Sequence, residues 1–435
     1  MANSRKSKPS PKAVRRIGVA VSGGLDSVVL LDTVCKSVKQ APLSDAEVWL
    51  FHIHHGLQKP ADQWLEFCEK LAKKYQINFD FRLLHFQDRS TGNIEARARA
   101  GRYEALTELC LEHEIEDLLL AHHQNDQAET ILLQLLRGSG VAGLSSMPHE
   151  RIHANKGHSI SLWRPLLGQS RADLEAYAKQ HKLKWVEDPS NQNLAYRRNA
   201  IRKQIIPRLE KIVPEAVSNL ARSADLLAQS QKLLDRLAIL DGEKIFRDGQ
   251  LQLRPLLDLA KQDLPAANNV MRYWLKSNDL AMPSQERLDA WWRDLKDLRA
   301  DAKLEWAHDG HRIYLWRGSL QIPRLVTGKW VWRPIAPKSS ALGLPASWVK
   351  EAKAQNRIEE RVRIGSEKLQ IGQNAPRKSL KNLYQEANVP PWERNAPLLF
   401  VNNELVGVAG VGLSYPHLVA SGKRIMPEWV QNPVK

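Results

Sequence analysis

The sequence predicts an α/β fold whose first domain is a Rossmann-like, doubly wound parallel sheet. Apolar runs of strand length alternate with helical patterns in this part of the chain, the strands at 17–21, 48–53, 78–84 and 117–121 and the helices at 26–39, 62–75, 93–112 and 126–137. Such alternation is typical of parallel sheets with helices on both faces. Ligands of these sheets bind at the carboxyl ends of the strands, where the motifs described below also lie.

The rest of the chain predicts a mainly helical domain followed by a small α+β domain. The helical part starts with an amphipathic pattern after Pro214, and a hairpin that turns at Asp309-Gly310 lies near its end. The final part holds two apolar strands joined by Asn402-Asn403, again in hairpin style. Between these domains, the Pro-containing stretch 333–345 is expected to be a linker.

The composition indicates a soluble protein with a polyanionic partner. The chain carries 64 basic and 48 acidic side chains, a formal charge of +16, and this excess is typical of nucleic-acid binding. Its three cysteines stand alone without a Cys-x-x-Cys pair, which fits a reducing cytosol. No apolar run approaches the roughly 18 residues of a membrane helix. We therefore expect a cytoplasmic protein that does not enter a membrane.

Residues 22–27, Ser-Gly-Gly-Leu-Asp-Ser, connect the first strand to the first helix. Two adjacent glycines let the backbone turn sharply, and the amides at the start of the helix attract an anion, which predicts a phosphate site. The loop lacks the Lys of the Gly-x-x-x-x-Gly-Lys-Ser/Thr motif and is therefore not suited to transfer of a terminal phosphate. A serine-capped helix after a glycine turn explains an isolated Ser-Gly-Gly equally well.

The second strand and the third helix carry polar side chains toward this loop. His52 and His54 share one face of the strand, but no thiolate or well-spaced third ligand completes a zinc site. Glu95, Arg99 and Arg102 lie one above another on the helix. A solvated, ion-paired face is the ordinary interpretation of such charges, and a ligand-binding face is the alternative.

His122, His123, Asp126 and Glu129 lie where a strand ends and a helix begins. The two carboxylates can form a capping box in which Asp126 is the cap and Glu129 its reciprocal partner. Two carboxylates beside two histidines also suit Mg²⁺ or the ammonium group of a lysine substrate. These residues alone leave both interpretations open.

A basic patch follows the turn Asp188-Pro189-Ser190-Asn191 and consists of Arg197, Arg198, Arg202 and Lys203. This cluster predicts contacts with phosphate groups. Residues 138–143 spell Gly-x-Gly-x-x-Gly, but they follow a helix instead of a strand. We therefore do not interpret them as a dinucleotide fingerprint.

In this order, the motifs resemble those of the tRNA(Ile)-lysidine synthetases, which belong to the PP-loop ATP pyrophosphatases. The matching segments are the loop at 22–27, the histidine motif at 52–57, the Asn-x-Glu helix at 93–103, the His-His segment at 122–130 and the Asp-x-Ser-Asn and Arg-Asn-x-Ile-Arg motifs within 188–202. Gln58 stands where the family usually has Arg, and Asn125 where an Asp is common. The C-terminal part is similar to the tRNA-binding domain of the longer members.

This resemblance implies an ATP-dependent ligase that forms lysidine in RNA. The wobble cytidine of the CAU anticodon would attack the α-phosphate of ATP through its ring carbonyl oxygen and release pyrophosphate, and the ε-amine of lysine would then displace AMP. ATP and Mg²⁺ are the implied cofactors, and isoleucine tRNA with a CAU anticodon and free L-lysine are the implied partners. The sequence leaves open whether the chain forms a homodimer.

The resemblance also assigns a role to each part of the chain. The expected order is a basic disordered tail over 1–16, the PP-loop ATP pyrophosphatase catalytic domain over 17–210, a connector helix and substrate-binding domain over 211–335, and a C-terminal tRNA-binding domain over 350–430.

The site residues implied by the family motifs fall into three groups. Nucleotide contacts are expected from Ser22, Gly23, Gly24, Leu25, Asp26, Ser27, His52 and Arg102, with Asp26 also holding Mg²⁺. Substrate contacts are expected from Glu95, Arg99, Arg137, Asn191, Arg198 and Arg202. Catalysis is assigned to Asp26, His122, His123, Asp126 and Glu129. The base that takes the proton of the lysine amine remains open among Glu129, His122 and His123.

Three other functions compete with this one. PP-loop tRNA thiolases often use paired cysteines, and amide synthetases such as those that make GMP or NAD share the same loop, but the chain has neither Cys-x-x-Cys nor a glutaminase domain. A non-catalytic tRNA-binding protein with a vestigial loop is the third alternative, against which the intact loop and carboxylates argue. Most tryptophans are expected in cores, but Trp291, Trp292, Trp330 and Trp332 lie among Arg and Lys and could stack on bases.

Overall fold

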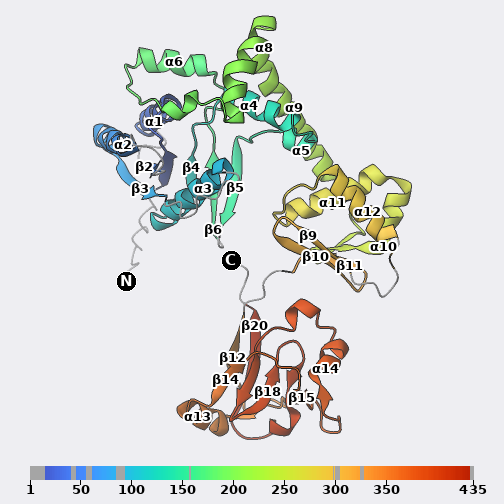
Figure 1. The fold of residues 1–435 in the computed structure, drawn as a ribbon. Coiled ribbons are helices and arrows are strands. Elements are labelled where there is room, and N and C mark those ends of the chain that lie inside the picture. The colour runs from blue at the N-terminus through green and yellow to red at the C-terminus, as the bar shows by residue number, and fades with distance from the viewer. Residues whose placement is uncertain are drawn as a thin grey trace, which may run out of the picture. The chain divides into compact units, whose positions relative to one another are not determined.

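The computed structural model describes residues 15–40, 46–54, 61–84, 94–155, 158–296, 298, 304–323 and 328–431. The chain divides into two compact units, Met1–Leu234 and Asp235–Lys435, which we describe separately (Figure 1). Of the tail predicted over 1–16, residues 1–14 lie outside the described residues, and Arg16 is instead the first residue of a strand. Predictions for Gln58 and Asn93, and for the side chain of Glu95, also lie outside the described residues.

The first unit contains a six-stranded sheet in the order β3-β2-β1-β4-β6-β5. Its strands are β1 (Arg16–Ala20), β2 (Glu47–His54), β3 (Asn78–Leu83), β4 (Asp117–Leu119), β5 (Glu150–Asn155) and β6 (His158–Trp163). All neighbouring pairs are parallel except β5 and β6, which form an antiparallel hairpin at one edge. The predicted, mostly parallel sheet is confirmed.

Helices cover both faces of this sheet (Figure 1). They are α1 (Leu25–Val38), α2 (Ala61–Tyr75), α3 (Ile94–Glu112), α4 (Gln124–Leu135), α5 (Val141–Leu144) and α6 (Arg171–Gln180). Side chains alternate along β2, so Leu50 lies in the core formed with α1, α2 and α6, and Phe51 lies in the core formed with α3. The doubly wound fold therefore follows from strands that are apolar on both faces.

Helix α4 begins two residues earlier than predicted, at Gln124 instead of Asp126. Its N-cap is His123, whose backbone N–H donates to Asp126 Oδ2 at 3.0 Å. Asp126 is therefore the reciprocal member of the cap and not the cap itself. Glu129 takes no part in this cap and is left for the contacts described below.

A helical segment that follows the sheet packs against α4. It contains η1 (Pro189–Gln192), α7 (Arg197–Ala200), the π-helical turn η2 (Ile201–Ile205) and α8 (Ile206–Ile212). Ile201 and Ile206 join Ala128 of α4 in a small buried cluster, which places Arg198 and Arg202 beside the carboxylates of α4. The predicted amphipathic helix after Pro214 is α9 (Ala216–Asp241).

The second unit starts with helices packed on a small antiparallel sheet. Its elements are β7 (Phe246–Arg247), β8 (Gln250–Gln252), α10 (Leu253–Gln262), α11 (Leu264–Ser277), α12 (Gln285–Lys296), β9 (Glu305–His308), β10 (His311–Trp316) and β11 (Ser319–Gln321). The sheet order is β7-β8-β11-β10-β9. The predicted hairpin between β9 and β10 is present, with positive φ at both Asp309 and Gly310 as a tight hairpin turn requires.

The tryptophans of this unit lie mainly in its cores. Trp291 and Trp292 are 4% and 5% exposed and belong to one apolar cluster, and the indole N–H of Trp292 donates to Asn268 Oδ1 at 2.6 Å. Trp330 is 8% exposed and donates to the carbonyl of Pro397. The rings of these three tryptophans are buried in apolar cores, so the prediction that they stack on bases is wrong. Trp332 is half-buried beneath Lys353.

The last part of the unit is a small α+β structure, as predicted. Its main elements are β12 (Gly328–Ile335), β13 (Leu344–Pro345), α13 (Ala346–Ala354), β14 (Ile358–Arg361), α14 (Leu380–Glu386), β17 (Leu398–Val401), β18 (Glu404–Val408) and β20 (Arg424–Gln431). β12 pairs with β20 over eight residues, so the expected linker at 333–345 begins inside a sheet. Arg424 also fixes the backbone of this stretch, because its guanidinium donates to the carbonyls of Pro337, Ser339 and Ala341.

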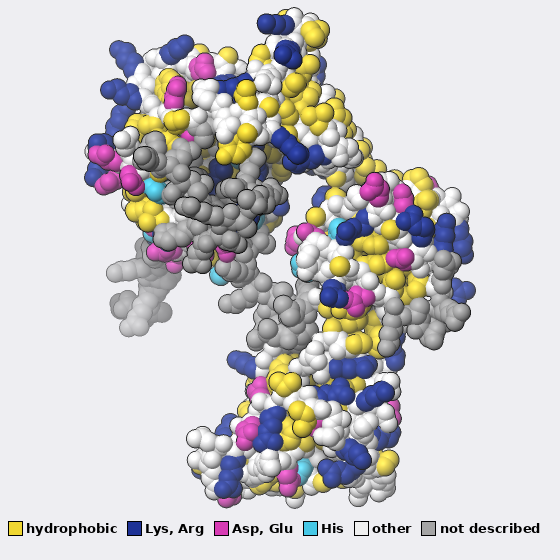
Figure 2. Space-filling view, viewed as in Figure 1, with side chains coloured by type: hydrophobic (Ala, Val, Ile, Leu, Met, Phe, Trp, Pro, Cys, Tyr) yellow, Lys and Arg dark blue, Asp and Glu magenta, His cyan; other side chains and the backbone are white. Residues whose placement is uncertain are grey.

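The surface of this α+β part is rich in basic side chains (Figure 2). Lys and Arg side chains are spread over the face that the figure shows, which agrees with the basic composition of the whole chain. Within the described residues, no helix is long and apolar enough to cross a membrane.

Candidate active site

The loop at 22–27 leaves the carboxyl end of β1 and enters α1. Gly23 has φ +89°, and a Cβ atom there would lie 2.8 Å from Cγ2 of Val186, so a side chain would be strained and crowded. Gly24 is the N-cap of α1, and because it has no side chain it accepts no capping hydrogen bond. The hydroxyl of Ser22 accepts from the N–H of Gly24, and that of Ser27 donates to the Gly24 carbonyl. A glycine and not a serine therefore caps the helix, which removes the alternative explanation of the motif.

A cavity of about 290 Å³ opens beside this loop. The predicted site residues in its wall are Ser22, Gly24, Asp26, Ser27, Arg99, Arg102, His122, Asp126 and Arg198. They come from the loop, from α3, from the end of β4 and from α4 and α7, so the fold brings four separate motifs to one place. Gly23 and Leu25 lie in the loop itself, without being among the lining residues.

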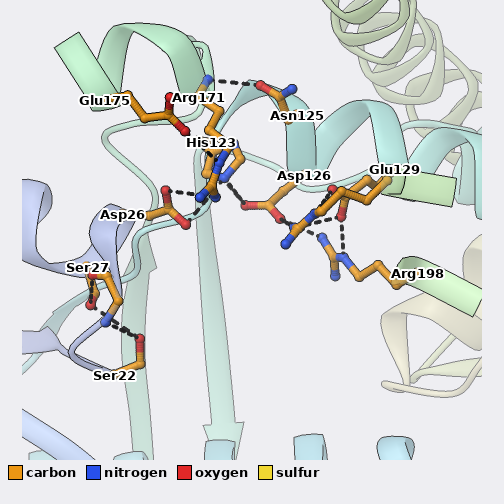
Figure 3. Close-up of polar contacts among 12 residues, drawn as sticks. Ser22, Asp26, Ser27, His123, Asn125, Asp126, Glu129, Arg171, Glu175 and Arg198 are labelled. Carbon is orange, nitrogen blue, oxygen red and sulfur yellow. Dashed lines mark hydrogen bonds and ion pairs between the residues drawn. The ribbon is translucent and has the colours of Figure 1, made fainter. Parts of the chain in front are cut away.

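One side of the site is a dense ion-pair network between α4 and the segment after the sheet (Figure 3). Glu129 is fully buried, and its oxygens accept from Nε of Arg198 at 2.6 Å and from Nε of Arg202 at 2.5 Å. Asp126 Oδ1 accepts from Nη2 of Arg198 at 2.9 Å. Burial alone would raise the pKa of Asp126, but the nearby His123 and Arg198 outweigh it and hold the pKa below its ordinary value.

His123 connects this network to the loop. Its Nε2 lies 3.5 Å from Asp26 Oδ2 and 3.5 Å from Asp126 Oδ2, and its ring is 1% exposed. It does not line the cavity. The two histidines therefore have different positions, with His123 behind the carboxylates and His122 facing the cavity.

His122 is kept neutral by its surroundings. Burial, followed by the cations Arg164, Arg198 and Arg99, lowers the pKa of His122 to about 3 against the opposing effect of Asp126. Its Nδ1 is buried without a hydrogen-bond partner in the part of the chain that the structure describes. A polar atom of this kind beside an open cavity is suited to a ligand or to water.

Two guanidiniums of α3, those of Arg99 and Arg102, have no counter-charge among the described residues. Within the described residues, Arg99 and Arg102 form no hydrogen bond or ion pair, and Arg99 lies only over the ring of Tyr103. Loss of hydration, followed by repulsion from Arg99 and Arg198, lowers the pKa of Arg102. Three guanidiniums and one unpartnered imidazole nitrogen in a single cavity favour a polyanionic ligand.

The remaining predicted residues lie away from the cavity wall. His52 is 3% exposed beneath the loop, where Nδ1 is 2.9 Å from the carbonyl of Val21 and where burial lowers its pKa. Arg202 belongs to the ion-pair network behind the cavity. Arg137 and Asn191 are exposed residues near the ends of α4 and η1. Contacts of these four with nucleotide or RNA stay predictions.

Two residues outside the predicted set complete the surroundings of Asp26. Nη1 of Arg171 is 3.6 Å from Asp26 Oδ1, and the backbone N–H of Arg171 donates to Asn125 Oδ1 at 2.9 Å (Figure 3). The sequence singles out Asn125 only as a departure from the family, and it does not single out Arg171. Their contact joins α4 to α6, which lie far apart in the chain, and no local pattern signals it.

Three family profiles match the chain, a PP-loop domain over residues 2–209, a TilS substrate binding domain over 255–321 and a TilS substrate C-terminal domain over 358–426. A tRNA(Ile)-lysidine synthase of Nitrosomonas europaea is 34% identical over 425 residues, which cover 94% of this chain and 90% of that protein. The chain belongs to the tRNA(Ile)-lysidine synthase family. A lysidine synthase of Salmonella typhimurium is 35% identical over 410 residues, covering 91% of this chain and 92% of that protein.

The family's PP-loop domain uses ATP, and the geometry of this chain fits that ligand. The N–H groups at the start of α1, and the guanidiniums of Arg99 and Arg102, which have no counter-charge among the described residues, offer donors for phosphate groups. Asp26 and Asp126 supply carboxylate oxygens of the kind that Mg²⁺ prefers. A solved U34-tRNA thiolase from Methanococcus maripaludis shares 18% identity with this lysidine synthase family member at a TM-score of 0.43, covering 49% of this chain and 72% of that one. That likeness is too distant to carry an inference.

Proposed function

We propose that this chain uses ATP to join lysine to the wobble cytidine of the CAU anticodon of isoleucine tRNA, which forms lysidine. The observation that carries the proposal is the ordered match to all three domains of the family, together with relatives of that name that match 94% and 91% of the chain. The intact loop, together with Arg99 and Arg102, which have no counter-charge among the described residues, supports an active enzyme and argues against a vestigial one.

The reaction has two displacement steps. The carbonyl oxygen on the cytosine ring attacks the α-phosphorus of ATP, the bond to the bridging oxygen breaks, and the electron pair leaves with pyrophosphate. The lysine ε-amine then attacks the activated ring carbon, and AMP leaves. The base must be out of the RNA stack for both steps, which a single-stranded anticodon loop permits at low cost.

The loop and the arginines of α3 bind the nucleotide in this proposal. The amides of Gly23 and Gly24 face the departing pyrophosphate, since the following helix attracts an anion at that end. Arg102 and Arg99 bind phosphate or RNA oxygens, because they have no protein counter-charge within the described residues. Asp26 holds Mg²⁺, which would offset charge that develops on the phosphates.

The contacts allow the three candidate bases to be ranked. Both oxygens of Glu129 accept from arginines, and its side chain is inaccessible, so it fits a residue that positions Arg198. His123 is separated from the cavity. His122 lines the cavity and is neutral, which is the form that accepts a proton. The pKa of His122 is lowered mainly by burial and further by cations that bound phosphates would offset, and we assign His122 as the base because it lines the cavity.

Lysine and Mg²⁺ can be tested together in one assay. The full-length protein is incubated with ATP, Mg²⁺, labelled lysine and a transcript of isoleucine tRNA that carries CAU. Label should enter the RNA only when ATP and Mg²⁺ are both present, and a transcript with the anticodon GAU should remain unlabelled. Label-free RNA under all these conditions would contradict the proposed function.

A further inference from the structure

We propose that Arg171 supplies the cation that the PP-loop lacks and that it contacts the pyrophosphate as this leaves. The inference rests on the proposed function, because it takes the nucleotide to be cleaved between its α and β phosphates. It adds a residue on α6 to a site otherwise lined by the loop at 22–27, β1, β2, α3, the end of β4, α4 and α7.

Arg171 is the first residue of α6 and reaches the start of α1. Its Nη1 is 3.6 Å from Oδ1 of Asp26, two residues after Gly24 of the loop, and its Nε is 3.2 Å from Oε1 of Glu175 (Figure 3). The side chain is 40% exposed. Oδ1 of Asp26 has no hydrogen-bond partner among the described residues, so its contact with Arg171 is one of charge alone. The guanidinium thus lies beside the loop with most of its donors free.

Backbone contacts hold the start of α6, and with it Arg171, in place. Asn125 accepts from its N–H at 2.9 Å, and the N–H of Gln124 donates to the carbonyl of Gln169 at 2.9 Å. Further along α6, the hydroxyl of Tyr177 donates to the buried Asp32 of α1 at 2.8 Å. These contacts tie the start of α6 to α4 and its middle to α1, so the backbone position of Arg171 relative to the loop is defined.

The guanidinium can move from Asp26 to a phosphate with little loss of stabilising free energy. Half-exposed ion pairs at this distance contribute little, whereas guanidinium and phosphate form two parallel, charge-assisted hydrogen bonds. In loops that bind terminal phosphates, a lysine of the loop itself reaches these oxygens. The loop at 22–27 contains no lysine. The guanidinium of Arg171, which lies beside the loop carboxylate Asp26, is placed to contact the same phosphate oxygens.

The role is electrostatic and moves no proton. When the bond between the α-phosphorus and the bridging oxygen breaks, the electron pair stays on the pyrophosphate, whose negative charge increases. Arg171 donates hydrogen bonds to those oxygens and stays protonated throughout. The N-terminal end of α6, a helix of ten residues, adds a favourable dipole at the same position.

The test measures the binding of inorganic pyrophosphate and of AMP to the full-length protein by calorimetry, with and without Mg²⁺. Arg171→Ala should weaken pyrophosphate about 10-fold under both conditions and leave AMP within about 2-fold, because a charged hydrogen bond is lost only at the pyrophosphate. Arg171→Lys should restore part of the affinity. The control is Lys179→Ala, which removes an exposed cation from the same helix and should change neither ligand.

Three outcomes decide the matter. Unchanged pyrophosphate affinity in Arg171→Ala would overturn the proposal. A loss that appears only with Mg²⁺ would also overturn it, because Arg171 would then act by orienting Asp26. A selective loss of pyrophosphate binding supports it even if the wild-type protein adds no lysine to RNA, and that second result would count against the proposed function alone.

Discussion

Two pairs of arginines beside the same cavity differ in how their charges are balanced. Arg198 and Arg202 share the oxygens of Glu129 and Asp126, and these carboxylates raise the pKa of both guanidiniums although burial alone would lower it. Arg99 and Arg102 have no such partners within the described residues, and the pKa of Arg102 is lowered by loss of hydration and by like charge. The charges of Arg198 and Arg202 are balanced by carboxylates, and among the described residues those of Arg99 and Arg102 are not.

This difference in charge balance distinguishes arginines that stabilise the site from arginines whose charge is free to bind a ligand. A paired, buried charge stabilises the fold around it only while both partners remain, so its loss is seen first as a loss of stability. An unpaired cation contributes repulsion to the empty protein and gains its partner when a polyanion binds. Family motifs alone do not make this distinction, since both pairs belong to them.

The largest effect on stability is expected for Glu129→Gln. This change removes the charge shared by Arg198 and Arg202 and should lower the free energy of unfolding by about 2–4 kcal/mol, less than for a wholly buried pair because the arginines are partly exposed. Urea unfolding of the full-length protein measures it. Glu108→Gln, an exposed carboxylate on α3, is the matched control, and equal stability of the two variants would contradict the account.

Arg102→Gln should show the opposite pattern. Its free energy of unfolding should stay within about 0.5 kcal/mol of the wild type, while its affinity for ATP should fall about 10-fold as a charged hydrogen bond is lost. Calorimetric titration with ATP gives the affinity. Arg208→Gln removes an exposed arginine from α8 and should leave both quantities unchanged. A strongly destabilised Arg102→Gln would erase the contrast between the two pairs.

The low pKa of His122 predicts a defined dependence of stability on pH. Between its ordinary pKa of 6.5 and the folded value of about 3, the unfolded chain binds a proton that the folded chain does not, so stability falls as pH falls. Relative to His122→Asn, the wild type should lose roughly 1–3 kcal/mol between pH 7 and pH 4. Urea unfolding at both values tests this, with the exposed His158→Asn as control. An unchanged difference would show that His122 is protonated in the fold.

A smaller effect is expected at the contact between α4 and α6. Asn125→Ala leaves the first N–H of α6 without its acceptor and should cost about 1 kcal/mol, as for a lost helix cap. Asn125→Asp keeps an acceptor and should retain most of the stability. Thermal unfolding of the two variants measures the difference, and equal midpoints would mean that the side-chain oxygen contributes nothing there.

Local patterns predicted the parts of the structure that depend on neighbours in sequence. Alternation of strands and helices gave the parallel sheet, and Asn402-Asn403 gave the hairpin of β17 and β18. The pairing of β12 with β20 was not predicted, because about a hundred residues separate them. The start of α4 was misplaced for a different reason, since a histidine is an unusual N-cap.

The site was predictable in membership but not in arrangement. The motifs identified Asp26, His122 and Asp126, which do line one cavity. They could not distinguish the buried Glu129 from a reactive carboxylate, because that depends on two arginines about seventy residues later in the chain. Arg171 escaped for the same reason, since its relation to Asp26 exists only in three dimensions.

The most direct test of the central claim is the fate of ATP labelled at its α-phosphate. With isoleucine tRNA bearing CAU but without lysine, we expect pyrophosphate to be released while the label stays attached to the RNA. Addition of lysine should then release the label as AMP. ADP as the main product would contradict the PP-loop assignment. Pyrophosphate exchange that requires lysine but not tRNA would contradict the proposed order of steps, because the adenylated species would be the amino acid and not the cytidine.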